Sequence, residues 1–232
     1  FPAALIAVIA DLIVPELTEA QVQGRLRGLG YMLERLYRLG LFFSMAVAGA
    51  CFFFAQPLGD LIYSEPAAGQ YIRLLAPLVP IMYMDTLVDG MLKGVGEYRA
   101  NMRYNIIDAA TGLLLVWLLL PRYGVAGYLF SIFATELLNF ALSAARLTRV
   151  TVFRLQPLCW LLTAAAAVGG WWLLRLLFGG LLSRVGQPLV LLLLVLLYLA
   201  CYGAALLLCG ALRREELSWL FSLLRGEKST KT

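Results

Sequence analysis

Long apolar runs without charged residues restrict the fold of this chain more than any other feature of its sequence. Residues 39–59 contain no charged side chain, and Asp60 follows them. The run is about as long as the ~20 residues that a helix needs to cross a bilayer. Similar runs recur along the whole chain, in which 62% of the residues are hydrophobic and only 14% are charged. A soluble domain needs far more polar surface. The sequence therefore predicts an all-α membrane protein, a polytopic bundle of transmembrane helices.

The runs and the breaks between them predict one partial and six full transmembrane helices. The partial helix covers residues 1–14 and is expected to end at Pro15. The full helices are expected at residues 39–59, 71–95, 101–120, 124–145, 155–178 and 185–212. Pro77 and Pro80 predict a kink in the second full helix, because each proline removes a backbone hydrogen bond. The chain begins with Phe1 and no basic segment, so we expect a fragment that lacks upstream helices rather than a signal peptide.

Two amphipathic segments are expected to lie at the membrane face rather than to cross it. The first covers residues 15–38, where leucines recur at spacings of three and four between charged residues. The second follows residue 212 and carries a similar stripe of Leu217, Leu220, Phe221 and Leu224. We expect both to anchor or pack at the membrane, with a regulatory or partner-binding role as the alternative.

The basic residues predict the orientation of the helices. Because the loops are short, consecutive helices are expected to run antiparallel, and this alternation places 15 of the 19 Lys and Arg residues on one side. The positive-inside rule makes that side cytoplasmic. The C-terminus is therefore expected in the cytoplasm.

One predicted helix carries three ionisable residues within the membrane. Asp85, Asp89 and Lys93 are spaced by four residues, which places them on one helical face. Such groups are costly in a bilayer and usually face a cavity or a partner. Pairing of Lys93 with Asp89 leaves Asp85 as the least compensated group. A water-filled cavity or a proton or cation site explains this arrangement, and so does an internal ion-pair ladder that locks neighbouring helices.

The next two predicted helices carry further polar residues. Asn105 and Asp108 lie near the start of the helix at 101–120, where Asp108 is expected to pair with Arg103 in a structural role. Glu136 and Asn139 are three residues apart at mid-span, so they share a face. This pair fits a hydrogen-bonded helix clamp and a transport site equally well. The candidate transport-site residues are Asp85, Asp89, Lys93, Asn105, Asp108, Glu136 and Asn139.

Other chemistry is not indicated. The chain has no His, and its four cysteines lie inside apolar runs without the spacing of a metal or redox motif. No phosphate-binding loop or nucleophile elbow is recognisable. We therefore expect no enzyme activity, no metal site, no cofactor and no nucleic-acid partner.

Several motifs resemble those of one transporter family. Residues 84–96 (MDTLVDGMLKGVG) resemble the DxxxDGxLKGxG pattern of stage V sporulation protein B and its relatives. The resemblance continues at residues 102–108, 120–128 and 136–140. Residues 14–20 are similar to the VPxxSEA segment of the family, with Thr18 where serine is usual. These proteins form the polysaccharide-transport branch of the multidrug/oligosaccharidyl-lipid/polysaccharide exporter superfamily.

The resemblance implies an architecture of fourteen helices, in two six-helix lobes followed by a terminal pair. Residues 1–150 are then expected to form the C-terminal lobe from its partial eighth helix to its twelfth. Residues 151–212 are expected to form the terminal helix pair, and residues 213–232 a cytoplasmic amphipathic tail. Beyond residue 150 only the pattern of two apolar spans supports this assignment.

The resemblance also implies a function. Family members flip lipid-linked sugars by rocking the lobes around a central cavity. We expect this protein to flip a lipid-linked oligosaccharide or lipid II-like peptidoglycan precursor across the bacterial cytoplasmic membrane. Its expected partners are a polyprenyl-pyrophosphate-linked sugar, membrane lipids, and a coupling cation or proton. The alternatives are a cation-coupled multidrug exporter of the same fold and a non-transporting membrane scaffold for cell-wall synthesis.

Overall fold

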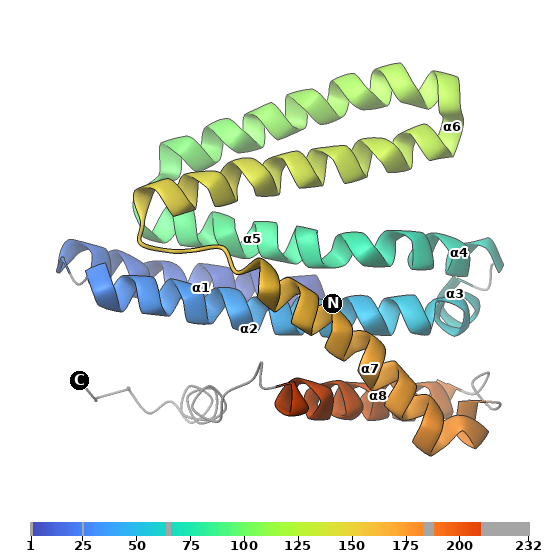
Figure 1. Cartoon of the computed structure of the whole chain (residues 1–232). Coiled ribbons are helices and arrows are strands. Elements are labelled where there is room, and N and C mark those ends of the chain that lie inside the picture. The colour runs from blue at the N-terminus through green and yellow to red at the C-terminus, as the bar shows by residue number, and fades with distance from the viewer. Residues whose placement is uncertain (1, 25, 64–65, 183–187, 210–232) are drawn as a thin grey trace. The chain divides into compact units, whose positions relative to one another are not determined.

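The computed structural model describes residues 2–24, 26–63, 66–182 and 188–209, and these residues form helices joined by short turns, without a strand (Figure 1). The elements in chain order are α1 (Pro2–Val22), α2 (Leu26–Phe53), α3 (Ala55–Tyr63), α4 (Pro66–Leu75), the 3-10 turn η1 (Ala76–Leu78), α5 (Val79–Gly94), α6 (Tyr98–Val150), α7 (Pro157–Leu182) and α8 (Pro188–Leu208). Five helical segments within the described ranges are long and apolar enough to cross a membrane. The protein is thus an all-α, multi-pass membrane protein, as the sequence predicts.

The longest element, α6, is a hairpin of two helical arms. Gly124 breaks the helix with a φ of 57° and a ψ of −138°, a conformation that glycine adopts far more readily than other residues. The two arms return side by side (Figure 1). They approach closely at Gly127, where a Cβ atom would lie 2.5 Å from the backbone oxygen of Leu119. Counting the arms separately gives six candidate spans among the described residues, which is the predicted number of full spans, although their bounds differ from the prediction.

Prolines set two helix breaks. The predicted kink at Pro77 and Pro80 is confirmed, because η1 separates α4 from α5 at these residues. The predicted helix at residues 39–59 is instead interrupted at Phe54, between α2 and α3. Pro57 explains this interruption, since it has no N–H group to donate to the carbonyl of Phe53.

Pro15 does not end the first helix, contrary to the prediction, because α1 continues to its last residue seven positions later. Packing on both sides of the proline explains its tolerance. Ala10 lies against Gly90 and Leu17 lies against Gly94, and a Cβ atom on either glycine would come within 3.0 Å of α1. The contacts between α1 and α5 therefore stabilise the continuation of the helix through Pro15.

The separate interfacial helix predicted within residues 15–38 is also absent from the described part of the chain. Residues 26–38 form the first half of α2, which runs on without a break into the apolar span. Their leucine stripe is buried, at Leu29, Leu33 and Leu36. The ring of Tyr37 packs on Phe153 with 5.1 Å between centroids. The stripe thus serves intramolecular packing, while the second predicted amphipathic segment, after residue 212, lies outside the described residues.

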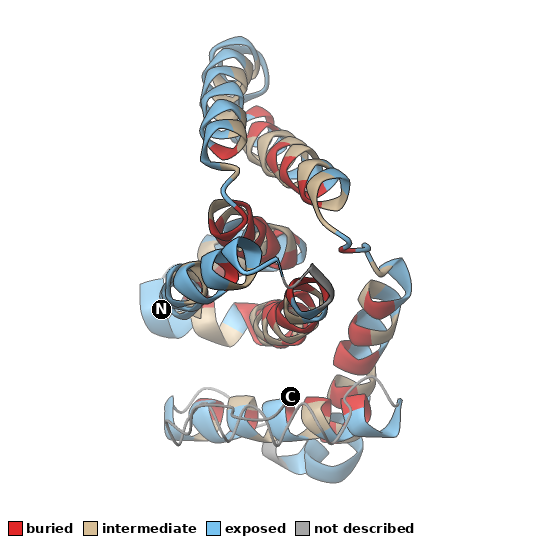
Figure 2. Cartoon of the chain, turned by 90° about the vertical axis from the view of Figure 1, so that its left-hand side faces the viewer, coloured by how far each residue is buried: buried red, intermediate tan, exposed pale blue. Residues whose placement is uncertain are grey.

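The chain forms two compact units. The first comprises Phe1–Ala48 and Leu74–Gln156, and the second comprises Gly49–Arg73 and Pro157–Thr232. In the first unit α5 contacts α1 and α6, and it is more deeply buried than the first arm of α6 (Figure 2). The expected division of the chain at residues 150 and 212 follows the family resemblance and stays a prediction.

In the second unit, aromatic rings join the end of α2 to α7 and α8. Phe53 stacks on Trp171 with 4.6 Å between ring centroids, and both Phe53 and Phe54 contact Tyr198. The α7 and α8 backbones meet at Gly170, where a Cβ atom would lie 2.9 Å from Tyr202 Cα. The terminal helix pair is therefore a packed element and not two independent spans.

Candidate functional site

Asp85 is a buried carboxylate bound by an amide from a neighbouring helix. It lies on α5 with only 8% of its surface exposed, and Asn139, on the second arm of α6, is 5% exposed. Asn139 Nδ2 donates a hydrogen bond to Asp85 Oδ2 over 2.9 Å. The other carboxylate oxygen of Asp85, Oδ1, and the amide oxygen of Asn139, Oδ1, are both buried without a hydrogen-bond partner among the described residues. Two acceptor oxygens are therefore left for a donor or a cation.

Asp89 lies one turn further along α5 and joins both arms of α6. Its Oδ2 accepts a hydrogen bond from Asn105 Nδ2 over 3.0 Å, and its Oδ1 accepts one from Ser143 Oγ over 3.1 Å. Its backbone carbonyl accepts a bond from Asn101 Nδ2 over 3.1 Å. Asn105 also donates to the side-chain oxygen of Asn101. We call Asp85, Asp89, Asn101, Asn105, Asn139 and Ser143 the polar seam.

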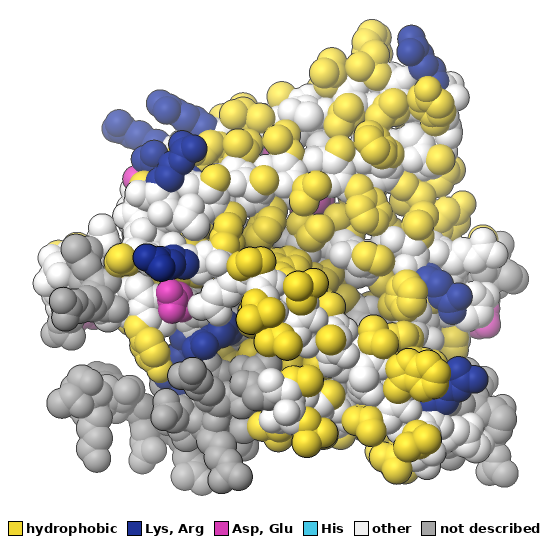
Figure 3. All heavy atoms as spheres, in the orientation of Figure 1, with side chains coloured by type: hydrophobic (Ala, Val, Ile, Leu, Met, Phe, Trp, Pro, Cys, Tyr) yellow, Lys and Arg dark blue, Asp and Glu magenta, His cyan; other side chains and the backbone are white. Residues whose placement is uncertain are grey.

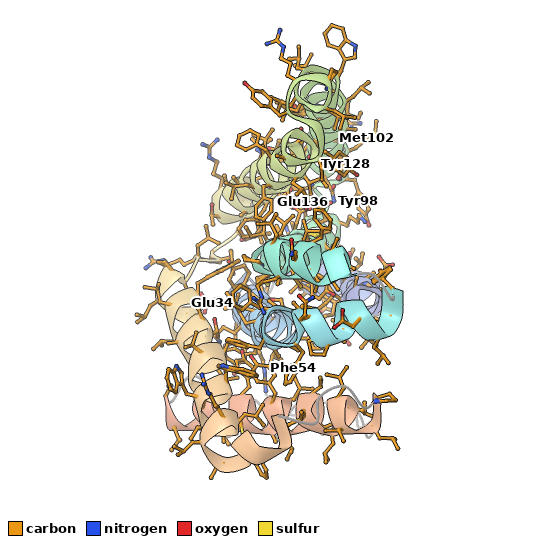
Figure 4. The ribbon with its side chains drawn as sticks, turned by 90° about the vertical axis from the view of Figure 1, so that its right-hand side faces the viewer. Glu34, Phe54, Tyr98, Met102, Tyr128 and Glu136 are labelled. Carbon is orange, nitrogen blue, oxygen red and sulfur yellow. The ribbon has the colours of Figure 1, made fainter. Side chains whose placement is uncertain are left out.

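Three candidate residues lie around the seam without bonding to it. Lys93 is one turn beyond Asp89 and interacts with it electrostatically, while an amide and a hydroxyl bind the Asp89 carboxylate oxygens. Asp108 and Glu136 are half-buried and lie within electrostatic range of Asp85. Glu136 is found between the α6 hairpin and α5 (Figure 4).

The expected pair between Asp108 and Arg103 is not formed within the described residues. Asp108 Oδ1 is instead a buried atom without a hydrogen-bond partner there. Its charge lies close to that of Glu136, so the two carboxylates face a shared environment. The structure thus gathers the seven predicted residues around one stretch of α5. Four of them are hydrogen-bonded to one another or to the seam, and the outer three are Lys93, Asp108 and Glu136.

Three residues of this region were not singled out from the sequence. Asn101 and Ser143 lie four residues from Asn105 and Asn139 respectively, so helical spacing could have found both. Glu97 lies just before α6 and binds Arg146, near the end of the same element, through two oxygens, with a shortest distance of 2.9 Å. This ion pair joins residues 49 positions apart, which no local pattern indicates.

A chain of helix contacts positions the seam. The backbone oxygen of Gly94 accepts a hydrogen bond from Thr18 Oγ1 over 3.0 Å, on the side of α5 where α1 packs. α5 is therefore held by α1 through close glycine contacts and by α6 through polar bonds. No group of three or more His, Cys, Asp or Glu side chains suited to a metal ion occurs in the described part of the chain. The seam fits helix coupling and the binding of a small cation or a proton donor.

Comparison with known proteins identifies relatives of the chain. The MatE family matches residues 22–118, a segment that includes Asp85, Asp89, Asn105 and Asp108. The chain is 27% identical over 144 residues to stage V sporulation protein B of Bacillus subtilis (strain 168), and the match covers 61% of this chain. It covers 28% of the relative, so the chain spans under a third of that protein's length.

These findings confirm the resemblance seen in the sequence motifs. The chain is therefore a multi-pass membrane protein whose residues 22–118 match the MatE family and whose sequence is similar to stage V sporulation protein B.

Proposed function

We propose that the protein flips a lipid-linked oligosaccharide or a lipid II-like peptidoglycan precursor across the bacterial cytoplasmic membrane by alternating access. The observation that carries this proposal is the MatE match over residues 22–118, which contains the α5 carboxylates. The similarity to stage V sporulation protein B and the DxxxDGxLKGxG-like motif of residues 84–96 support the sugar-lipid branch. The orientation with a cytoplasmic C-terminus belongs to the same proposal and is supported by the distribution of basic residues.

In this proposal the polar seam and its acidic surroundings form the coupling element. Asp85 and Asn139 each keep one buried oxygen free of described partners, and Asp108 and Glu136 add negative charge nearby. Buried acceptors without partners cost free energy. A coupling cation or a proton at Asp85 would provide the partner that these oxygens lack. The seam bonds then transmit the occupancy of this position to both arms of α6.

The terminal pair is assigned to lipid contact. α7 and α8 expose large apolar side chains along much of their length, among them Leu161, Trp172, Leu176, Leu192 and Leu196. Such surfaces suit membrane lipid or the polyprenyl tail of a sugar-lipid substrate. A head group with a pyrophosphate is repelled by the acidic seam, so its binding is assigned to other surfaces of the protein.

The test uses the full-length protein in bacteria depleted of their lipid II flippase, with externalised lipid II as the readout. Wild type is expected to restore externalisation, and Asp85→Asn and Glu136→Gln are expected to lower it at least tenfold at equal membrane abundance. Asp60→Asn is the matched control, because this exposed carboxylate lies in α3. Absence of lipid II externalisation by an abundant, correctly inserted wild type contradicts lipid II as the substrate and leaves another lipid-linked oligosaccharide. Full activity of both variants contradicts the coupling role alone.

One observation favours a second candidate, a cation-coupled exporter of cationic drugs. Asp85, Asp89, Asp108 and Glu136 place four carboxylates in and around the seam, and Lys93 lies within electrostatic range of Asp89. Such a surface attracts cations. Efflux of ethidium from cells expressing the protein, together with failure to externalise lipid II, would select this candidate.

A further inference from the structure

The α6 hairpin carries four exposed arginines at the end where its two arms begin and end. Arg99 and Arg103 lie one turn apart on the first arm, Arg149 lies at the end of the second arm, and Arg154 follows in the link to α7. We call these four residues the arginine cluster. Figure 3 shows Lys and Arg side chains gathered at this end of the hairpin, on the left of the view.

The Glu97–Arg146 ion pair holds the two halves of the cluster together. Glu97 precedes the first arm and Arg146 lies in the last turns of the second, and they are bound through both carboxylate oxygens. Within residues 97–107 and 137–156 the sequence contains no other acidic residue. Glu97 is thus engaged by Arg146, and the four arginines of the cluster outnumber the acidic residues of these two segments.

Exposed apolar side chains alternate with the arginines. Met102 is 66% exposed beside Arg103, and Val152 is 64% exposed between Arg149 and Arg154. Tyr98 is also exposed, next to Arg99 (Figure 4). Exposed apolar side chains are unfavourable on a surface that faces only water. At the boundary between lipid head groups and acyl chains, both arginines and apolar side chains are favourable.

The opposite end of the hairpin marks the other boundary. Arg122 and Tyr123 are exposed at the tip, and Trp117 and Tyr128 flank it on the two arms. This is the composition of an aromatic belt. Arg103 and Arg122 are 19 residues apart, about 28 Å of helix at ~1.5 Å per residue, which is close to the thickness of the hydrocarbon core.

We propose that the arginine cluster at the base of the α6 hairpin binds the head groups of anionic phospholipids. Arginine is suited to this partner, because its planar fork donates two hydrogen bonds to one phosphate. The apolar side chains between the arginines insert among the first methylenes of the acyl chains. The surface is separate from the polar seam, so the proposal holds for any transported substrate.

The experiment uses the full-length protein, delipidated in a neutral detergent. It is offered phosphatidylglycerol and phosphatidylcholine with identical acyl chains, and retained lipid is counted by native mass spectrometry. Wild type is expected to prefer phosphatidylglycerol. Either double variant, Arg99→Gln/Arg103→Gln or Arg149→Gln/Arg154→Gln, is expected to weaken phosphatidylglycerol binding roughly 30-fold, from about 1 kcal/mol per arginine. Phosphatidylcholine binding is expected to stay unchanged.

Arg122→Gln is the matched control, since it removes one exposed arginine at the tip of the same hairpin. Both double variants must keep the wild-type melting temperature and elution volume, and Arg99→Lys/Arg103→Lys is used if a glutamine variant is unstable, with a smaller loss expected. Equal retention of both lipids by wild type overturns the proposal, as does an undiminished preference in both stable double variants. Displacement of bound phosphatidylglycerol by millimolar glycerol phosphate also overturns it, because the site would then recognise a soluble phosphate.

Discussion

At the residue scale, the informative contact is the buried bond between Asp85 and Asn139. An acceptor and a donor from different helices meet at 2.9 Å while one oxygen of each remains without a described partner. A pair built only for stability would satisfy all its atoms, because buried polar atoms without partners cost free energy. The incomplete set calls for an explanation, and the proposed function supplies one in a coupling cation or proton at this position.

Removing the amide alone is expected to destabilise the protein. Asn139→Leu deletes the one described hydrogen bond to the Asp85 carboxylate, which should lower the free energy of unfolding by about 1–2 kcal/mol. Thermal unfolding of the purified full-length protein measures this effect. Gln70→Leu, at an exposed amide in α4, serves as the control and is expected to change little.

The double variant Asp85→Leu/Asn139→Leu distinguishes stability from function. Removing both polar groups is expected to recover most of the stability lost in Asn139→Leu, since no buried carboxylate is then left without its donor. Transport should nevertheless remain lost. Recovery of transport together with stability would make the pair a structural clamp.

At the element scale, α5 is the helix that contacts both α1 and α6 in the first unit. It meets α1 through glycines and both arms of α6 through the polar seam. Close glycine contacts permit a short distance between α1 and α5, in the way that small residues generally do between membrane helices.

A methyl group in this contact is expected to force the helices apart. The Cβ atom of Gly90→Ala would lie 2.8 Å from Ala10 Cβ and 2.9 Å from Ala10 O, so the variant should lose about 1–3 kcal/mol of stability. Adding Ala10→Gly should restore part of the loss, because the methyl contact is relieved while the backbone contact remains. Gly203→Ala in α8 meets no atom within 4 Å and is the control in the same unfolding assay.

Charge reversal tests the connection between the two ends of α6. Glu97→Arg or Arg146→Glu alone is expected to destabilise the protein, since like charges then face each other over the bidentate contact. The loss should be modest, about 1 kcal/mol, because both side chains are partly exposed. The double variant Glu97→Arg/Arg146→Glu should recover most of the lost stability in the same unfolding measurement. Melting temperatures equal to wild type for both single variants and the double variant would show that the ion pair does not contribute to stability.

At the scale of the whole molecule, the arrangement of basic residues predicts which ends share a side of the membrane. Arg122 lies at the hairpin tip and Arg149 at its base. In a cysteine-free background, Arg122→Cys is expected to react with an impermeant maleimide added to intact cells, whereas Arg149→Cys should react only after permeabilisation. The reverse labelling pattern would contradict a cytoplasmic base and the expected orientation.

The sequence predicted the helices well because membrane spans are defined by apolar length, a local property. The prediction that Asp85 and Asp89 share a helical face is confirmed, because residues four positions apart lie on the same side of an α-helix. The sequence did not indicate the partners of these residues, because Asn139 and Ser143 are each 54 positions away from the carboxylate they bind. The continuation of α1 through Pro15 was missed for the same reason: the contacts of Ala10 and Leu17 that stabilise it come from α5.

The turn at Gly124 has a consequence for how the chain enters the membrane. Because only a few residues join the arms of α6, the second arm follows the first into the membrane at once, and the tip carries Arg122 and Tyr123 across the hydrocarbon. Each arm alone also leaves its polar residues facing acyl chains. Biogenesis therefore favours insertion of the hairpin as a unit, with α5 already in place to receive Asn139 and Ser143. Lengthening the turn would free the arms to insert one at a time and expose the assembly to misfolding and proteolysis.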